Sequence, residues 1–186
     1  MVNLTDTNSR LLDGAMQQFN RHGFAKTSMS DIAEAAGISR TSLYKHFSTK
    51  EAVFKGLSER INSRVYETVV AAYSDSGPWN KRLLAVINAR VSWVYELLHQ
   101  SEYGRELINE KNRICGGEIL AANDRLKSLV ARLLEEELKE KSKADLLASL
   151  LIQSVNGVLE KAHTSKEAEA NVTLLVEVFC RGMVTD

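Results

Sequence analysis

The sequence predicts an all-α protein, and three observations support this fold class. The chain of 186 residues contains one proline, Pro78, and ten glycines, so few residues interrupt helices. Apolar side chains recur every three or four residues, and no segment shows the alternation of a half-buried strand. Hydrophobic residues make up 44% of the chain and charged residues 26%, which is typical of a soluble globular protein with a sizeable core.

The first fifty residues predict three short helices. Residues 9–22 place apolar side chains on one face, and Gly23 ends this helix because glycine accepts a positive φ. A second helix begins at Ser28 and a third at Ser39, since serine can accept a hydrogen bond from a backbone N–H of the first turn. The expected inward-facing side chains are Leu11, Leu12, Ala15, Met16, Phe19, Met29, Ile32, Ala33, Ala36, Leu43 and Phe47.

Residues 51–186 predict a larger helical bundle that follows an N-terminal domain of residues 1–50. A long helix begins at Lys50, and residues 74–78 form the clearest break after it. Gly116 and Gly117 are expected to interrupt the helical run. Further helices are expected at about 79–100, 119–141, 143–163 and 167–183, which, with a segment at 103–115 that the pattern leaves ambiguous, makes about nine helices.

Charge is balanced over the whole chain but not locally. The 24 Lys and Arg residues offset 24 Asp and Glu residues. Residues 39–50 nevertheless hold Arg40, Lys45 and Lys50 and no acidic residue, which predicts a local basic patch. Cys115 and Cys180 have no partner at CxxC spacing, so we expect buried thiols in a reducing cytoplasm, with a redox-sensing pair as the alternative.

Residues 28–47 have the organisation of a helix-turn-helix. The Ser28-x-x-Asp31 pattern predicts a cap for the helix that begins at Ser28, which is the first helix of the motif. Gly37 supplies the positive φ of the tight turn that follows. The second helix of such a motif can enter the major groove of DNA. Its solvent face is expected to carry Ser39, Arg40, Thr41, Ser42 and Lys45.

The side chains of the second helix of the motif, and Lys50 at the start of the next helix, suit DNA in different ways. Arg40 is suited to bidentate pairing with guanine, and Thr41 offers a hydroxyl for phosphate and a methyl for thymine. Tyr44, His46 and Lys50 are suited to phosphate oxygens, which fix the register on DNA and carry no sequence information. The alternative is a helical hairpin in an unrelated bundle, whose exposed face is only polar.

The segment from about residue 10 to residue 57 resembles the TetR family of bacterial transcriptional repressors. The resemblance is carried by Gly23-Phe24, Thr27-Ser28, Ile32-Ala33, Ala36-Gly37-Ile38-Ser39, Leu43-Tyr44-Lys45-His46-Phe47 and Lys50-Glu51. It implies that Thr27 and Ser28 contact DNA together with positions 40–42, 44, 46 and 50. The family commonly has glycine where this chain has Thr41, so the operator sequence cannot be carried over.

The resemblance also implies a C-terminal domain that binds a ligand and forms a homodimer. The candidate pocket residues, for each of which packing or solvation is the alternative, are Trp93, Glu96, Leu97, Tyr103, Asn112 and Cys115. The last two helices are expected to pair with those of a second copy, and a monomer core is the alternative. The candidate interface residues are Leu146, Leu150, Val155, Leu159, Val172, Val176 and Phe179.

These features predict a dimeric, cytoplasmic repressor that binds a palindromic DNA operator and is released by a small-molecule effector. An activator or a ligand-independent regulator of the same family is the alternative, and an all-helical enzyme or interaction module is a further one. No metal-ligand spacing, Ser-His-Asp order or phosphate-binding glycine loop is present in the sequence, so we expect no enzyme, metal site or cofactor. The sequence identifies neither the effector nor the regulated genes.

Overall fold

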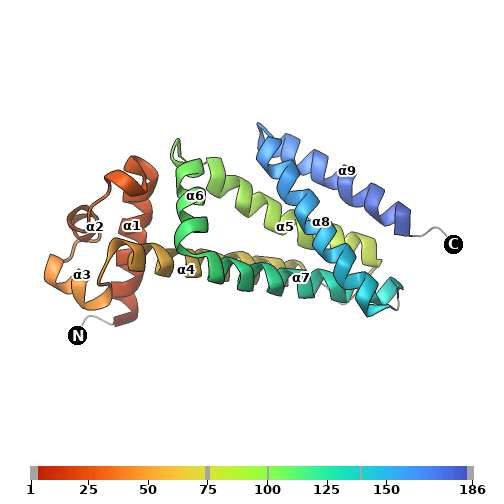
Figure 1. Cartoon of the computed structure of the whole chain (residues 1–186), viewed down its shortest axis with the longest axis horizontal. Coiled ribbons are helices and arrows are strands. Elements are labelled where there is room, and N and C mark those ends of the chain that lie inside the picture. Colours follow the sequence, from red (N-terminus) through yellow and green to blue (C-terminus); the bar gives the residue numbers. More distant parts are fainter. Residues whose placement is uncertain (1–3, 74–75, 100, 139, 184–186) are drawn as a thin grey trace. The chain divides into compact units, whose positions relative to one another are not determined.

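Helices joined by short connections make up the fold in the computed structural model, which describes residues 4–73, 76–99, 101–138 and 140–183. This part of the chain contains nine helices and no strand, so the predicted fold class is confirmed (Figure 1). The helices are α1 (Leu4–Lys26), α2 (Met29–Ala35), α3 (Arg40–His46), α4 (Lys50–Ala72), α5 (Trp79–His99), α6 (Gly104–Ile114), α7 (Gly116–Leu138), α8 (Lys141–Lys161) and α9 (Ser165–Met183).

The helical run is interrupted next to Gly116 and Gly117, close to the expected place. α6 ends at Ile114 and α7 begins at Gly116, so Cys115 alone lies between them. Gly116 and Gly117 form the first residues of α7. Glycine is better tolerated at a helix end than in its interior, because the first N–H groups have no partner within the helix.

One compact unit comprises residues 1–62 and 98–119. In it α1 packs against α2 and α6, and α2 packs against α3 (Figure 1). Phe19, Phe24 and Phe54 meet at its centre, with ring centroids 5.2–5.5 Å apart. The aromatic cluster therefore joins side chains of α1 and α4 in one core.

This first unit extends beyond the predicted domain of residues 1–50. Residue 50 is the start of α4, but Val53, Phe54 and Leu57 of that helix are buried in the same core as α1. Cys115, next to α6, is buried there as well. The first turns of α4 and the α6 segment thus complete a core that α1, α2 and α3 do not close by themselves.

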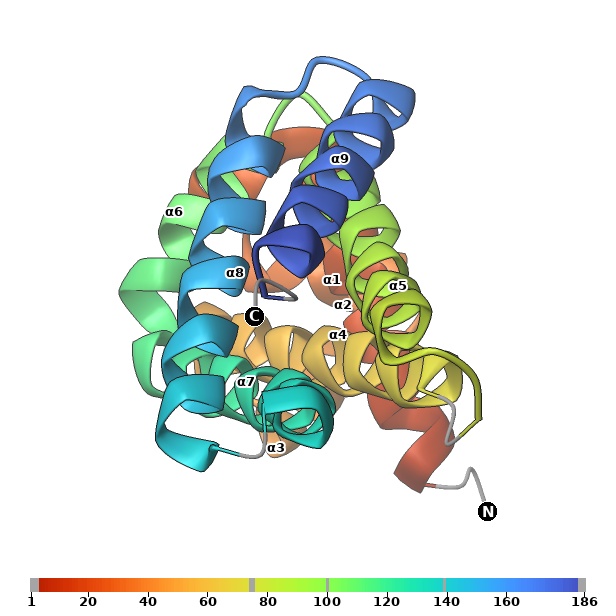
Figure 2. The same cartoon turned by 90° about the vertical axis from the view of Figure 1, so that its right-hand side faces the viewer.

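The second compact unit comprises residues 63–97 and 120–186. Its core is formed by apolar side chains of α4, α5, α7, α8 and α9. α8 and α9 run side by side, as both Figure 1 and Figure 2 show. Their buried side chains are Ala144, Ala148, Leu151, Ile152, Val155, Leu159, Ala168, Val172, Val176 and Cys180.

No helix in the described part of the chain is long and apolar enough to cross a membrane. Within those same residues, no group of three or more His, Cys, Asp or Glu side chains is placed to hold a metal ion. Cys115 and Cys180 are both buried, as expected, and are not joined by a disulfide. Burial raises the pKa of the Cys180 thiol, so the neutral thiol predominates near neutral pH.

Candidate nucleic-acid interface

Helix α2 is capped as the sequence predicts. Ser28 Oγ accepts a hydrogen bond from the N–H of Asp31 (3.2 Å), and Asp31 Oδ2 accepts one from the N–H of Ser28 (2.8 Å). The backbone hydrogen bond from Ser28, followed by that from its hydroxyl, lowers the pKa of the Asp31 carboxyl. The negative charge of this carboxylate also suits the N-terminal end of a helix. The cap fixes the start of α2 and so directs Ile32 and Ala33 into the core.

The turn between α2 and α3 is held by a side chain of α1. Gly37 has φ +65°, which confirms the positive φ expected of this tight turn. Arg10 Nη2 donates hydrogen bonds to the carbonyl oxygens of Ala36 (2.8 Å) and Gly37 (3.1 Å). These contacts satisfy carbonyl groups at the end of α2. The sequence does not single out Arg10, because its partners lie 26 and 27 residues away.

Helix α3 presents a polar face to solvent. Its first turn is capped by Ser39, whose Oγ accepts a hydrogen bond from the N–H of Ser42 at 3.1 Å. Leu43 is fully buried, whereas Ser42 and His46 are partly buried. The exposed side chains of this face are Arg40, Thr41, Tyr44 and Lys45. None of these four makes a side-chain hydrogen bond or ion pair within the described part of the chain, so their polar groups can meet a ligand.

The polar groups of Thr27 and Lys50 donate hydrogen bonds to backbone carbonyl oxygens of the chain itself. Thr27 is buried, and its hydroxyl donates to the carbonyl oxygen of Gly23 at 2.7 Å. Lys50 Nζ donates to the carbonyl oxygens of Phe24 (2.6 Å), Ala25 (3.3 Å) and Thr27 (2.8 Å), and lies 4.4 Å from the centroid of the Phe24 ring. An ammonium group has three donors, so this arrangement leaves none for a phosphate. In place of the expected DNA contact, we therefore propose that both side chains hold the segment between α1 and α2.

The segment between α1 and α2 is held from α6 as well. Gly23 interrupts α1 with φ 77° and ψ 168°. The N–H of Ala25 donates to Glu106 Oε1 at 3.0 Å. The positive φ favours glycine here, and a Cβ would in addition lie 2.8 Å from Tyr103 Cδ1 and 2.5 Å from Glu106 Oε2, so the Glu106 carboxylate would have to shift. The Lys50 ammonium of α4 and the Glu106 carboxylate of α6 thus hold the segment just before the helix-turn-helix.

The helix-turn-helix segment matches a known protein family. Residues 11–57, which include α2, the turn and α3, match the model of "Bacterial regulatory proteins, tetR family". Residues 11–57 are thus a TetR-family regulatory domain. The transcriptional regulator TtgR of Pseudomonas putida is 30% identical over 104 residues, which are 50% of this chain and 50% of TtgR. The chain thus spans about half the length of the curated relatives it matches first.

Solved structures of TetR-like proteins share the whole fold. A TetR-like transcriptional regulator from Rhodococcus sp. RHA1 matches with a TM-score of 0.74 and 23% identity, over 100% of both chains. SmeT, the repressor of the Stenotrophomonas maltophilia multidrug efflux pump SmeDEF, matches with a TM-score of 0.70 and 22% identity, over 97% of this chain and 93% of SmeT. At these identities the likeness shows the fold alone.

The expected ligand residues fall into both compact units. The second unit holds Trp93, which is partly buried, Glu96, which is exposed, and Leu97, whose side chain lies outside the described ones. The first unit holds Tyr103, Asn112 and Cys115. Tyr103 packs at Gly23, Asn112 is exposed, and Cys115 is fully buried in the core of α1–α4. Cys115 lies in the short connection between α6 and α7 and packs into this core.

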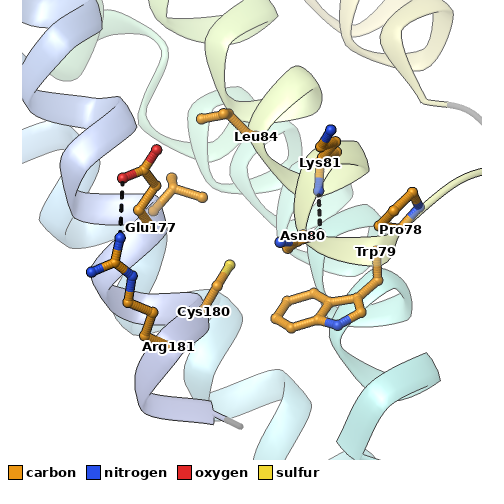
Figure 3. A pocket seen from close by; sticks show the side chains of 9 residues that line it. Pro78, Trp79, Asn80, Lys81, Leu84, Glu177, Cys180 and Arg181 are labelled. Atoms are coloured by element: carbon orange, nitrogen blue, oxygen red, sulfur yellow. Dashed lines mark hydrogen bonds and ion pairs between the residues drawn. The ribbon is translucent and has the colours of Figure 1, made fainter.

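A pocket of about 720 Å³ lies in the second unit, between the start of α5 and the end of α9. Figure 3 shows Trp79 of α5 and Cys180 of α9 on facing sides, with Glu177 and Arg181 paired at 3.9 Å. The other lining side chains include Lys81, Leu84 and Val176. None of the expected ligand residues whose side chains are described lines this pocket, which is lined by apolar side chains and by charged groups of both signs.

The expected dimer residues divide between the core and the surface. Four of them are at most 3% exposed and pack into the chain's own core, so they offer no surface to a partner: Val155, Leu159, Val172 and Val176. Phe179 is partly buried. Leu146 and Leu150 are 60% and 48% exposed, and the sequence analysis missed Leu174 and Val178, which are 61% and 58% exposed. Their four-residue spacing was the available signal, but it does not distinguish the outer edge of a wide apolar face from its buried part.

Proposed function

We propose that the chain is a transcriptional regulator that binds operator DNA as a dimer, represses transcription and releases the DNA when an effector binds. DNA binding is supported above all by α3, whose exposed face is polar, carries two cations and lies within the matched TetR-family domain. No ion pair or hydrogen bond within the described residues occupies the side chains of Arg40 and Lys45. Such a protein would act in the cytoplasm, where the chromosome of a bacterium lies.

Each exposed side chain of α3 has a distinct proposed role. Arg40, in the first turn, pairs with the O6 and N7 atoms of a guanine, and Thr41 contacts a neighbouring base or phosphate. Tyr44 and Lys45 bind phosphate oxygens, together with Ser42 and His46 at the edge of the face. Ser28 and Ser39 act mainly as caps, whose hydroxyls orient the two helices.

We propose that the dimer surface consists of Leu146 and Leu150 on α8 with Leu174 and Val178 on α9. Four large apolar side chains exposed on two adjacent helices make a patch that a soluble monomer seldom leaves open. A second copy would cover it with the same patch about a twofold axis. Two recognition helices are then available for successive major grooves, about 34–36 Å apart, of a palindromic site.

The repressor sign and the ligand response are supported by SmeT, which is named as a repressor and has also been solved in complex with triclosan. An effector acts only through different affinities for the DNA-binding and released states of the dimer. A coupling of about 1–3 kcal/mol would weaken DNA binding by about 5- to 150-fold.

The proposal is tested by fluorescence anisotropy with the DNA upstream of the chain's own gene. We expect specific binding at moderate salt, and Arg40→Ala should lose about 1–3 kcal/mol of discrimination at one base pair. Arg132→Ala on α7, which removes an exposed arginine far along the sequence, is the control and should leave discrimination unchanged. A folded dimer without specific binding would contradict the proposal.

A further inference from the structure

Helix α5 carries two arginines, Arg82 and Arg90, with buried guanidinium nitrogens, and only Arg82 pairs with a carboxylate among the described residues. Arg82 is 8% exposed, and its two terminal nitrogens donate to the two carboxylate oxygens of Glu136 on α7 at 2.6 and 3.2 Å. Arg90, eight residues later, donates from Nη2 to the amide oxygen of Asn156 on α8 at 2.8 Å. Arg90 Nη1 is buried and has no hydrogen-bond partner among the described residues.

The charge of Arg90 therefore lacks the compensation that Arg82 has. Burial lowers the pKa of Arg90 to about 10, so the group still carries its proton near neutral pH. An amide oxygen is a weaker partner for a cation than a carboxylate is. A buried charge without an opposite charge destabilises the fold, and a bound anion would remove that penalty.

The surroundings of Arg90 on its own helix are apolar. Trp93 and Val94 follow Arg90 by three and four residues, so their side chains emerge from the same side of α5. Both are partly buried. A cation and an amide beside an indole ring suit a molecule with a negatively charged head and an apolar body.

We propose that Arg90 and Asn156 bind the carboxylate or phosphate group of an organic effector, whose apolar part lies along Trp93. A guanidinium offers five N–H donors in a plane, which match two oxygens of such an anion. The oxygen of Asn156 orients Arg90, and its NH₂ group, which makes no hydrogen bond to the described residues, can donate to the same anion. This inference rests on the proposed ligand response and names the chemical class of the effector.

The first test compares Arg90→Met with Arg82→Met in thermal unfolding of the full chain without ligand. Methionine keeps an apolar stem and removes the charge. Arg82→Met should lower the midpoint by roughly 5 °C, because it removes two charged hydrogen bonds to the half-exposed Glu136 carboxylate. Arg90→Met should leave the midpoint unchanged or raise it. An equal drop for both variants would show that Arg90 is a structural residue and overturn the inference.

The second test is calorimetric titration with sodium benzoate, sodium octanoate and phenyl phosphate against benzamide, octanamide and phenol. At least one anion should bind, and its neutral counterpart should bind at least tenfold more weakly. Arg90→Met should weaken that anion at least tenfold, with a smaller loss in Arg90→Lys. Binding of none of the three anions, or equal binding by Arg90→Met, would overturn the proposal.

Two readouts separate this inference from the proposed function. An anion that binds through Arg90 but leaves DNA affinity unchanged would support the anion site and contradict the ligand-responsive regulator. DNA release by a neutral compound, undiminished in Arg90→Met, would support the regulator and overturn the anion site. Dissociation of the dimer by Arg90→Met in sedimentation would assign Arg90 to an interface with a second copy, which also overturns the anion site.

Discussion

Replacing Lys50 by alanine should destabilise the DNA-binding unit without removing a phosphate contact. The Lys50 ammonium donates to the carbonyl oxygens of Phe24, Ala25 and Thr27 and lies over the Phe24 ring. These contacts fix the segment that joins α1 to α2. The exposed Lys45 on α3 has no such partner within the described residues, and Lys45→Ala is therefore the matched control.

The expected loss follows from these contacts. Hydrogen bonds to a charged group contribute about 1.5–3 kcal/mol net, and an exposed cation–π contact about 0.5–1 kcal/mol. Lys50 is partly exposed, and water can reach some of the released carbonyls, so we expect about 2 kcal/mol less unfolding free energy. For a chain of this size, that corresponds to a midpoint about 4–8 °C lower. Lys45→Ala should leave the midpoint within about 1 °C, since surface substitutions usually cost little.

The decisive assay is the salt dependence of DNA affinity at a temperature where both variants are folded. Lys45→Ala should reduce the slope of log affinity against log salt by about one per protomer, because one phosphate contact is lost. Lys50→Ala should weaken binding with an unchanged slope. If Lys50→Ala instead lowered the slope by about one and unfolded at the wild-type temperature, Lys50 would be a phosphate ligand and the reasoning would be refuted.

Two other substitutions test the packing of α1 and the dimer surface. Gly23→Ala should lower the unfolding midpoint more than Gly77→Ala. Both glycines have positive φ, but a Cβ at Gly23 would lie 2.8 Å from Tyr103 Cδ1 and would displace the Glu106 carboxylate that accepts from the Ala25 N–H, whereas one at Gly77 would meet nothing within 4 Å. Equal drops would mean that backbone strain alone decides both sites. Leu150→Glu should convert the dimer to monomers in sedimentation velocity, because it places a charge in the proposed apolar patch, whereas Asn123→Glu on α7 should not. A dimer that persists in Leu150→Glu at micromolar concentration would exclude that surface.

The caps and the turn of the motif were predictable because their determinants are local. Ser28 and Asp31 bond each other across three residues, and Ser39 accepts from Ser42 at the same spacing. Gly37 has the positive φ that its place between two helices requires. In the second unit, apolar periodicity also located α5, α7, α8 and α9 to within a few residues.

Contacts between distant residues were not predictable in the same way. The hydrogen bonds of Lys50 to Phe24, Ala25 and Thr27 join residues 23 to 26 positions apart, and the one from Ala25 to Glu106 spans 81. A lysine next to a helix-turn-helix looks the same in sequence whether it binds phosphate or backbone carbonyls. Likewise, the sequence does not show whether an arginine in an apolar helix will donate its hydrogen bonds to a carboxylate or to an amide oxygen.

The sequence by itself determined the all-α class, the helix-turn-helix and its polar recognition face, because hydrophobic period, caps and turns act within a few residues. The tertiary structure decided which polar groups remain free for a partner. In the folded chain, Lys50 and Thr27 donate hydrogen bonds to backbone carbonyl oxygens, whereas Arg40 and Lys45 remain exposed. The apolar faces of α8 and α9 are partly buried in the core and partly exposed. The physical reason is that a periodic pattern specifies that a side chain is buried, whereas only the packed chain specifies which neighbour buries it.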